Sequence, residues 1–139
     1  MKRTYGQTPE GAGAAGKAER NRIELLQSRI HLLDGMDRLL MTMHLENGNS
    51  FRQIARLVGM NEASIARRIK KITKRLADGE YIKCLRSRNR FTKQELAIAK
   101  DYFLSDEPIR KIAEKRNCTY YHIHKNIERI KEVVAEVSK

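Results

Sequence analysis

The sequence predicts an all-α fold in which two three-helix units in tandem follow an extra N-terminal helix. Apolar residues recur at spacings of three and four over most of the chain, which is the pattern of helices that bury one face. Residues that favour helix caps and tight turns separate these stretches. An internal repeat, whose constant offset takes Ile54 to Ile112, indicates that one scaffold occurs twice.

The N-terminal region divides into an arm and a helix. Residues 1–16 (MKRTYGQTPEGAGAAG) are rich in Gly and Ala and offer little to bury, which predicts a disordered basic arm. Residues 17–33 carry an apolar stripe at helical spacing, which packs either on its own domain or on a second subunit. The stripe consists of Ile23, Leu26, Ile30 and Leu33. Asp34-Gly35 then ends or bends the helix.

The first unit, which together with the N-terminal helix spans residues 17–79, has two helices before its long helix. The first runs from about 36 to 46 and ends at Asn47-Gly48-Asn49. Ser50 is the predicted N-cap of a short helix over 51–58. The inward residues of the first helix are predicted to be Leu39, Leu40 and Met43.

A tight turn and a long helix complete the first unit. Gly59 supplies the positive φ that such a turn needs, and Asn61 caps a helix over about 62–77. Asp78-Gly79 stops this helix. Its inward residues are predicted to be Ile65, Ile69, Ile72 and Leu76.

A basic connector over residues 80–91 (EYIKCLRSRNRF) leads to the second unit, over 92–139. The connector has Tyr81, Ile82 and Leu85 to bury, so it is not a flexible linker throughout. Thr92 caps the first helix of the second unit, which runs to about Leu104. The apolar side of that helix is predicted to hold Leu96, Ala99, Tyr102 and Phe103.

Two further helices complete the second unit. Ser105 or Asp106 is the predicted cap of the next helix, with Pro108 tolerated in its first turn. Arg116-Asn117 forms a turn, and Thr119 opens a last helix that ends near Val137.

The buried frame, the turn and the cap all repeat at the same offset. Gly59 corresponds to Asn117, which also tolerates a left-handed turn, and Asn61 corresponds to Thr119, another N-cap residue. Surface positions do not repeat, as expected of one scaffold with two different binding faces. The apolar pairs are Ile54/Ile112, Ala55/Ala113, Ile65/Ile123, Ile69/Ile127 and Ile72/Ile130.

A short helix, a turn and a longer helix form the helix-turn-helix motif, in which the second helix presents its N-terminal exposed residues to the major groove. Residues 36–76, above all SFRQIARLVGMNEASIARRIKKITKRL, resemble region four of bacterial sigma factors and the related response-regulator domains. The matching residues are Ser50, Ile54, Ala55, Gly59, Ser64 and Ile65. The resemblance implies a sigma-like factor, with RNA polymerase or another transcription protein as a further partner.

The second unit matches this pattern more loosely, because Asn117 replaces the glycine and Pro108 occupies the serine position. The sigma regions that bind the polymerase core and melt the promoter are not visible, which argues against a complete sigma factor.

The charge indicates a polyanionic partner. The chain has 29 Lys and Arg residues against 17 Asp and Glu residues, a net charge of +12. Nucleic acid is the first candidate and a membrane surface the second. No apolar run approaches the roughly 20 residues that span a bilayer, and no signal peptide precedes the helices. We therefore expect a cytoplasmic protein, associated with the nucleoid when bound to DNA.

No cofactor, metal or catalytic site is expected. Cys84 and Cys118 do not cluster, which indicates two reduced thiols. His122 and His124 point to different sides of a helix and cannot easily chelate one metal. The sequence lacks a Gly-rich phosphate loop and a nucleophile elbow, so we do not expect an enzyme.

The predicted DNA contacts concentrate on residues 50–93, which hold thirteen basic and three acidic side chains. In the first long helix, base-edge contacts are predicted for Ser64, Arg67 and Arg68, because arginine pairs in a bidentate way with guanine. Arg86, Arg88 and Arg90 of the connector lie either in a minor groove or beside phosphates. Phosphate contacts are predicted for Arg52, Lys70, Lys71, Lys74 and Arg75.

The second long helix presents a different set of residues. Tyr120, Tyr121 and His122 are predicted to contact bases, and Lys125 and Arg129 to contact phosphates. Residues 94–139 are nearly neutral, with nine basic and eight acidic side chains. This unit therefore either reads DNA weakly or binds a protein.

Sequence-specific binding of double-stranded DNA by a transcriptional regulator is the favoured interpretation. The alternatives are a detached DNA-binding module of the transposase or recombinase type and a protein-interaction adaptor of the transcription machinery. RNA binding is disfavoured because aromatic side chains are only 6% of the chain. A homodimer through the 17–33 helix stays open.

Overall fold

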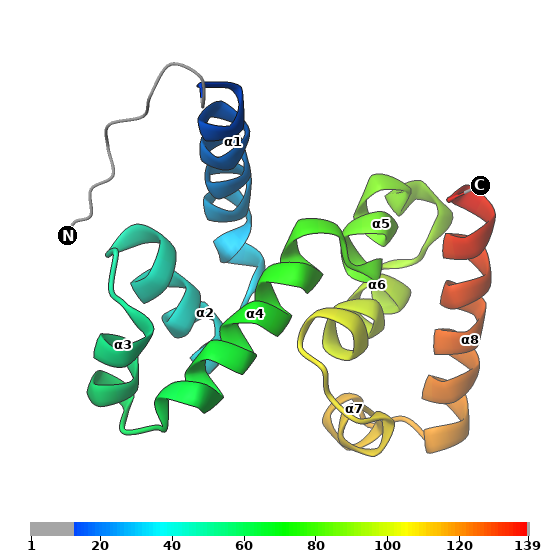
Figure 1. Cartoon of the computed structure of the whole chain (residues 1–139). Coiled ribbons are helices and arrows are strands. Elements are labelled where there is room, and N and C mark those ends of the chain that lie inside the picture. Colours follow the sequence, from blue (N-terminus) through cyan, green and yellow to red (C-terminus); the bar gives the residue numbers. More distant parts are fainter. Residues whose placement is uncertain (1–12, 139) are drawn as a thin grey trace.

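The computed structural model describes residues 13–138, and every regular element in this range is helical, which confirms the all-α class (Figure 1). The α-helices are α1 (Gly13–Arg29), α2 (Gly35–Met41), α3 (Phe51–Val58), α4 (Glu62–Asp78), α5 (Glu80–Arg86), α6 (Lys93–Ala99), α7 (Ile109–Arg116) and α8 (Tyr120–Val137). Single turns of tighter or wider helix are η2 (Ile30–Leu32), η3 (Thr42–Glu46), η4 (Arg88–Arg90) and η5 (Lys100–Leu104).

The N-terminal helix is longer than the sequence predicted. α1 begins at Gly13, so residues 13–16 of the predicted arm are helical, and residues 1–12 lie outside the described residues. The two alanines at 14 and 15 favour continuation of the helix. The apolar stripe packs within the chain, because Leu26, Ile30 and Leu33 are buried in its own core.

Arg29 ties α1 to the end of α4. Its Nη1 atom donates hydrogen bonds to the carbonyl oxygens of Leu76 and Ala77, at 2.8 and 2.7 Å. These carbonyls belong to the last turn of α4, where no further turn of helix supplies donors. Arg29 thus fixes α1 against α4, the helix that carries more of the predicted DNA contacts than any other.

The internal repeat extends to whole helices. At the offset that takes Ile54 to Ile112, α2, η3 and α3 have the same bounds as α6, η5 and α7, respectively. The helices α4 and α8 also begin at equivalent residues. We call Gly35–Asp78 the first repeat and Lys93–Val137 the second repeat. Equivalent backbone hydrogen bonds also recur, such as Met60 N to Ala55 O and Cys118 N to Ala113 O, both 2.9 Å.

Left-handed residues occur at equivalent turns of the two repeats. Gly59 and Asn117 end α3 and α7 with φ of 73° and 57°, as the sequence predicted. Gly48 corresponds to Asp106, whose φ is also positive at 57°. Asp106 is therefore not a helix cap, which corrects the prediction for α7. The extended residue before that helix is Pro108, at the position equivalent to Ser50.

One prediction of an inward side chain needs correction. Leu39 is 43% exposed, whereas Leu40 and Met41 are buried. Successive side chains on a helix point about 100° apart, so Leu39 and Met41 cannot both face the core beside Leu40. In the second repeat Ala99 is buried and Leu96, Tyr102 and Phe103 are half-buried against the core, as the sequence predicted, beside the buried Ile98 and Leu104.

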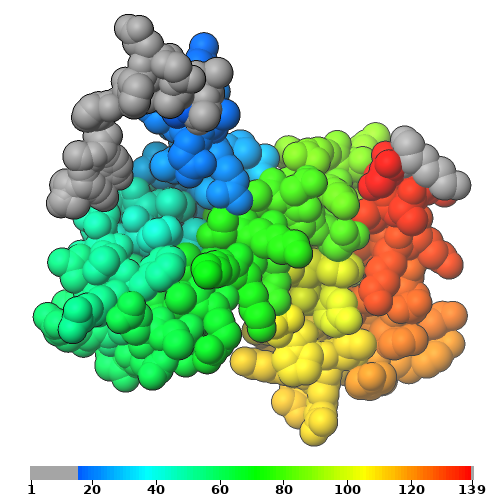
Figure 2. All heavy atoms as spheres, viewed as in Figure 1, coloured from blue at the N-terminus to red at the C-terminus, as the bar shows by residue number. Residues whose placement is uncertain are grey.

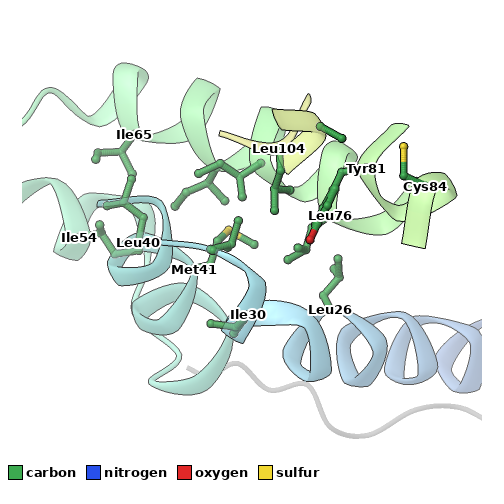
Figure 3. Packing of buried hydrophobic residues seen from close by; sticks show 14 of the residues in the cluster. Leu26, Ile30, Leu40, Met41, Ile54, Ile65, Leu76, Tyr81, Cys84 and Leu104 are labelled. Atoms are coloured by element: carbon green, nitrogen blue, oxygen red, sulfur yellow. The ribbon is translucent and has the colours of Figure 1, made fainter. Parts of the chain in front are cut away.

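The predicted connector is partly helical and contributes to the core. Residues 80–86 form α5, which buries Tyr81, Ile82 and Cys84. Tyr81 and Cys84 join a core cluster that extends from Leu26 of α1 to Val134 of α8. Figure 3 shows part of this cluster, from Leu26 to Leu104. A second, smaller cluster lies within the second repeat and consists of Ile98, Ile112, Ala113, Ile123 and Ile127.

The second repeat holds α7 with an ionic network around a buried aspartate, at positions that are occupied by apolar residues in the first repeat. Asp101 is 5% exposed and accepts hydrogen bonds from Arg116 Nε at 2.6 Å and Lys115 Nζ at 3.0 Å. The equivalent residues of the first repeat are Met43, Val58 and Leu57. The hydrogen bond to Asp101 raises the pKa of Arg116, which keeps this network charged.

Candidate nucleic-acid interface

The N-terminal end of α4 is fixed by local caps. Ser50 begins α3 with a capping box, because its hydroxyl accepts from Gln53 N while the Gln53 side chain accepts from Ser50 N. After the left-handed turn, the Asn61 side chain accepts from Ala63 N at 2.8 Å and Ser64 N at 3.2 Å. These caps set the point at which α4 starts and the face that it exposes.

One face of α4 is apolar and the other is basic. Ile65, Ile69, Ile72 and Leu76 are at most 1% exposed, as the sequence predicted. On the opposite face, four of the predicted contact residues are exposed, and none forms an ion pair with another residue of the described range. They are Arg67, Lys70, Lys71 and Lys74. Their positive charge is therefore available to a polyanion.

Two other arginines of α4 form ion pairs with aspartates of the same chain. Arg68 contacts Asp37 of α2 through Nε and Nη2, both at 3.0 Å. Arg75 lies 3.1 Å from the carboxylate of Asp106 in the second repeat. A base contact by Arg68 or a phosphate contact by Arg75 would have to share the guanidinium with these aspartates, through the N–H groups that the ion pairs leave free, or displace them. Neither Asp37 nor Asp106 was predicted as an ion-pair partner, because no local spacing rule connects either of them to its arginine.

A basic cleft separates α4 from the loop before α7. It has a volume of about 350 Å³, and its lining includes Ser64, Arg67, Lys71, Ser105 and Asp106. In the space-filling view, the surface is hollowed between the green first repeat and the yellow start of the second (Figure 2). Five of the seven predicted contact residues of α4 thus line this cleft, and Lys70 and Lys74 are not in its lining.

The connector arginines do not act as one segment. Arg86 pairs with Asp78 at 3.2 Å, and Arg90 pairs with Glu136 of α8 at 2.7 Å. Arg88 is exposed in η4. Because α5 is helical and packed, these arginines point to different neighbours, and a minor-groove insertion by all three would need two ion pairs to break.

The exposed face of α8 is aromatic at its beginning. Tyr120 and Tyr121 are 57% and 68% exposed. The Tyr120 ring stacks with His124 at a centroid distance of 6.2 Å, and Lys125 Nζ lies 5.8 Å from the centre of the Tyr121 ring. His122 is exposed and receives a contact from Asn126. These side chains can stack, donate and accept, but they add little positive charge.

Two predicted cations outside the main face have different surroundings. Arg52 is exposed on α3. Arg129 of α8 pairs with Glu95 of α6 at 2.9 Å, which fastens α8 to the start of its own repeat. Glu95 is 8% exposed and also completes the capping box with Thr92. The same carboxylate therefore caps α6 and holds α8 against it.

Comparisons with protein-family models, with characterised proteins and with solved structures find no match to this chain. Among the described residues, no group of three or more His, Cys, Asp or Glu side chains is placed to hold a metal ion. No helix in the described range is long and apolar enough to cross a membrane.

Proposed function

We propose that the protein binds double-stranded DNA through two helix-turn-helix units and acts as a transcriptional regulator. The observation that carries the proposal is the exposed cationic face of α4, which follows a short helix, a left-handed turn and an Asn cap. This order of elements is that of the helix-turn-helix motif, and the cations lie where that motif faces the major groove. Their charge would supply the salt-dependent part of the affinity.

The N-terminal ends of α4 and α8 support the proposal further. Both lie toward the lower edge of Figure 1, on the side of the molecule away from the N-terminal end of α1. One duplex along that side would meet both helices. RNA polymerase or another transcription protein is a further partner of such a regulator.

A salt series of DNA binding tests the proposal. Native protein is titrated against random-sequence duplex at several salt concentrations, together with Arg67→Ala/Lys71→Ala. Both residues are exposed and unpaired among the described residues, so the variant removes charge without opening an ion pair. We expect about ten- to hundredfold weaker binding and a salt dependence lower by about two counterions.

Lys17→Ala/Arg20→Ala is the matched control. It removes the same charge from exposed positions on α1, at the opposite end of the molecule. An equal loss of DNA affinity in both variants would indicate that the protein attracts DNA through its overall charge and not through α4. Absence of binding by native protein at low salt would overturn the proposal.

A protein-binding adaptor is the second candidate function. The observation that favours it is the exposed pair Tyr120 and Tyr121 on a repeat that is nearly neutral. Exposed tyrosines are enriched at protein interfaces. The adaptor predicts that Arg67→Ala/Lys71→Ala retains its function while Tyr120→Ala/Tyr121→Ala loses it.

A further inference from the structure

The two proposed reading helices have the same scaffold but unlike surfaces. At the first turn, Glu62 and Ala63 of α4 correspond to Tyr120 and Tyr121 of α8. Farther along the helices, Lys70 and Lys74 of α4 correspond to Glu128 and Glu132 of α8, and all four side chains are exposed. Two helices with different leading residues and opposite charges cannot favour the same base sequence. Their two half-sites must therefore differ.

The junction between the repeats leaves little freedom for them to move apart. Gly79 alone separates α4 from α5, and its N–H donates to Arg75 O at 2.9 Å. A Cβ atom at Gly79 would lie 2.5 Å from that same oxygen, so the backbone between the two helices admits only glycine. The junction is therefore a single residue held against the last turn of α4, and not a flexible linker.

Packing and charge reinforce this joint. Leu76, Tyr81 and Cys84 belong to the same buried cluster as Leu104 of the second repeat (Figure 3), and Val134 of α8 is also in it. An ion pair of 3.1 Å joins Arg75 of the first repeat to Asp106 of the second. Another, of 3.2 Å, joins Lys100 of the second repeat to Asp34, the residue just before the first repeat. Closely packed interiors are not continuously deformable, so the distance and angle between α4 and α8 are fixed by the fold.

We infer that a single chain occupies one non-palindromic duplex site, made of two unlike half-sites at one fixed spacing. This inference rests on the proposed function, and it adds the class of DNA that the protein recognises. A symmetric dimer would require a palindromic site, and flexibly joined units would accept several spacings. Because α4 and α8 of one chain have unlike surfaces, we expect them to read different half-sites, and because the junction is packed, we expect one spacing between these half-sites.

The inference is tested with the full chain and selected DNA. Sites are selected from random duplex, and the stoichiometry on the best site is measured by sedimentation. We expect an asymmetric motif bound one to one. About 5 and about 10 base pairs, half a turn and a full turn of duplex, are then inserted between the half-sites. Both insertions are expected to weaken binding about tenfold or more, because α8 can no longer reach its half-site.

Two single variants assign the half-sites. Selection with Arg67→Ala is expected to lose sequence preference in one half of the motif, and selection with Tyr121→Ala in the other half. Both side chains are exposed, so neither change disturbs the core. Circular dichroism of each variant checks that the helices are retained.

The other outcomes are distinguishable. Full affinity after the insertion of a whole turn would show that the repeats move independently, and it would overturn the inference while leaving DNA binding in place. A palindromic motif bound by two chains would also overturn it. No binding to any duplex at low salt would overturn the proposed function and this inference together.

Discussion

Arg67 and Arg68 are neighbours in the chain with different surroundings. Arg68 is held by Asp37, whose side chain is only 15% exposed, whereas Arg67 is exposed and donates a hydrogen bond to Ser64 at 3.3 Å. The difference comes from α2, which passes one side of α4. Sequence reasoning placed both arginines on the reading face, because helical spacing does not show which neighbouring element brings a carboxylate.

Arg68→Ala is expected to lower the free energy of unfolding by about 1 kcal/mol, because Asp37 loses its cation in a poorly solvated position. Arg67→Ala is expected to change it by less than about 0.5 kcal/mol. Urea denaturation followed by circular dichroism measures both variants. Equal stabilities would show that the Arg68–Asp37 pair contributes nothing.

The thiol of Cys84 is buried, and its ionisation is unfavourable in the folded protein. Burial raises the pKa of its thiol from 9.0 to about 11, and the nearby Glu80 carboxylate acts in the same direction. The unfolded chain ionises at the lower value. The folded state is therefore fully favoured below pH 9, and this contribution is lost as the pH rises from 9 to 11.

The native protein is expected to lose about 2 kcal/mol more than Cys84→Ala over this alkaline range. The comparison isolates Cys84 from the tyrosines and lysines, which titrate in both proteins. Urea denaturation at pH 8, 9, 10 and 11 measures the difference. If the free energy of unfolding fell equally with pH in the two proteins, the folded state would not raise the pKa of this thiol.

At the scale of elements, caps and turns were the most predictable features. Ser50, Asn61 and Thr92 accept the hydrogen bonds expected of N-caps, and α3 has the predicted bounds. These signals are local, since a cap and its partners lie within one turn of each other. The apolar stripe of α4 was predictable for the same reason.

Features that depend on distant residues could not be predicted. α5 is a short helix of two turns, and its helical form is supported by burial of Tyr81 and Cys84 against both repeats. The ion pairs of Arg75 and Arg90 join residues that are far apart in the chain. The candidate site was therefore predicted as a set of cations on α4, but the subset held by internal carboxylates was not.

The turn between the two helices of each repeat provides a direct test of the element scale. Gly59 has a φ of 73°, and a Cβ atom there would meet nothing within 4 Å. Gly59→Ala is therefore expected to cost about 1 kcal/mol, from backbone strain alone. Gly59→Asn is expected to cost less, because Asn117 adopts the same conformation at the equivalent position.

Thermal and urea denaturation of the two Gly59 variants measure this difference, with Asn117→Gly as the reciprocal control. Asn117→Gly should leave the stability nearly unchanged, because glycine accepts a positive φ without strain. Equal costs for alanine and asparagine at position 59 would show that the turn is not selected by its left-handed backbone.

At the scale of the whole molecule, the repeats share a core although they duplicate one scaffold. Leu104, Ile130 and Val134 of the second repeat belong to the same cluster as the core of the first. Only the smaller cluster around Ile112 and Ile127 is confined to one repeat. A shared core couples the stability of the repeats, since exposing one part leaves the other with unfilled contacts.

We therefore expect one cooperative unfolding transition. Ile54→Ala and Ile112→Ala remove equivalent side chains, each 0% exposed, from the shared cluster and the smaller cluster respectively. Each should destabilise the whole chain by about 3 kcal/mol and shift the same transition. Circular dichroism and tyrosine fluorescence should report coincident midpoints. Two transitions, with each variant moving only one, would show that the repeats unfold independently, and a fixed spacing between α4 and α8 would then lose its physical basis.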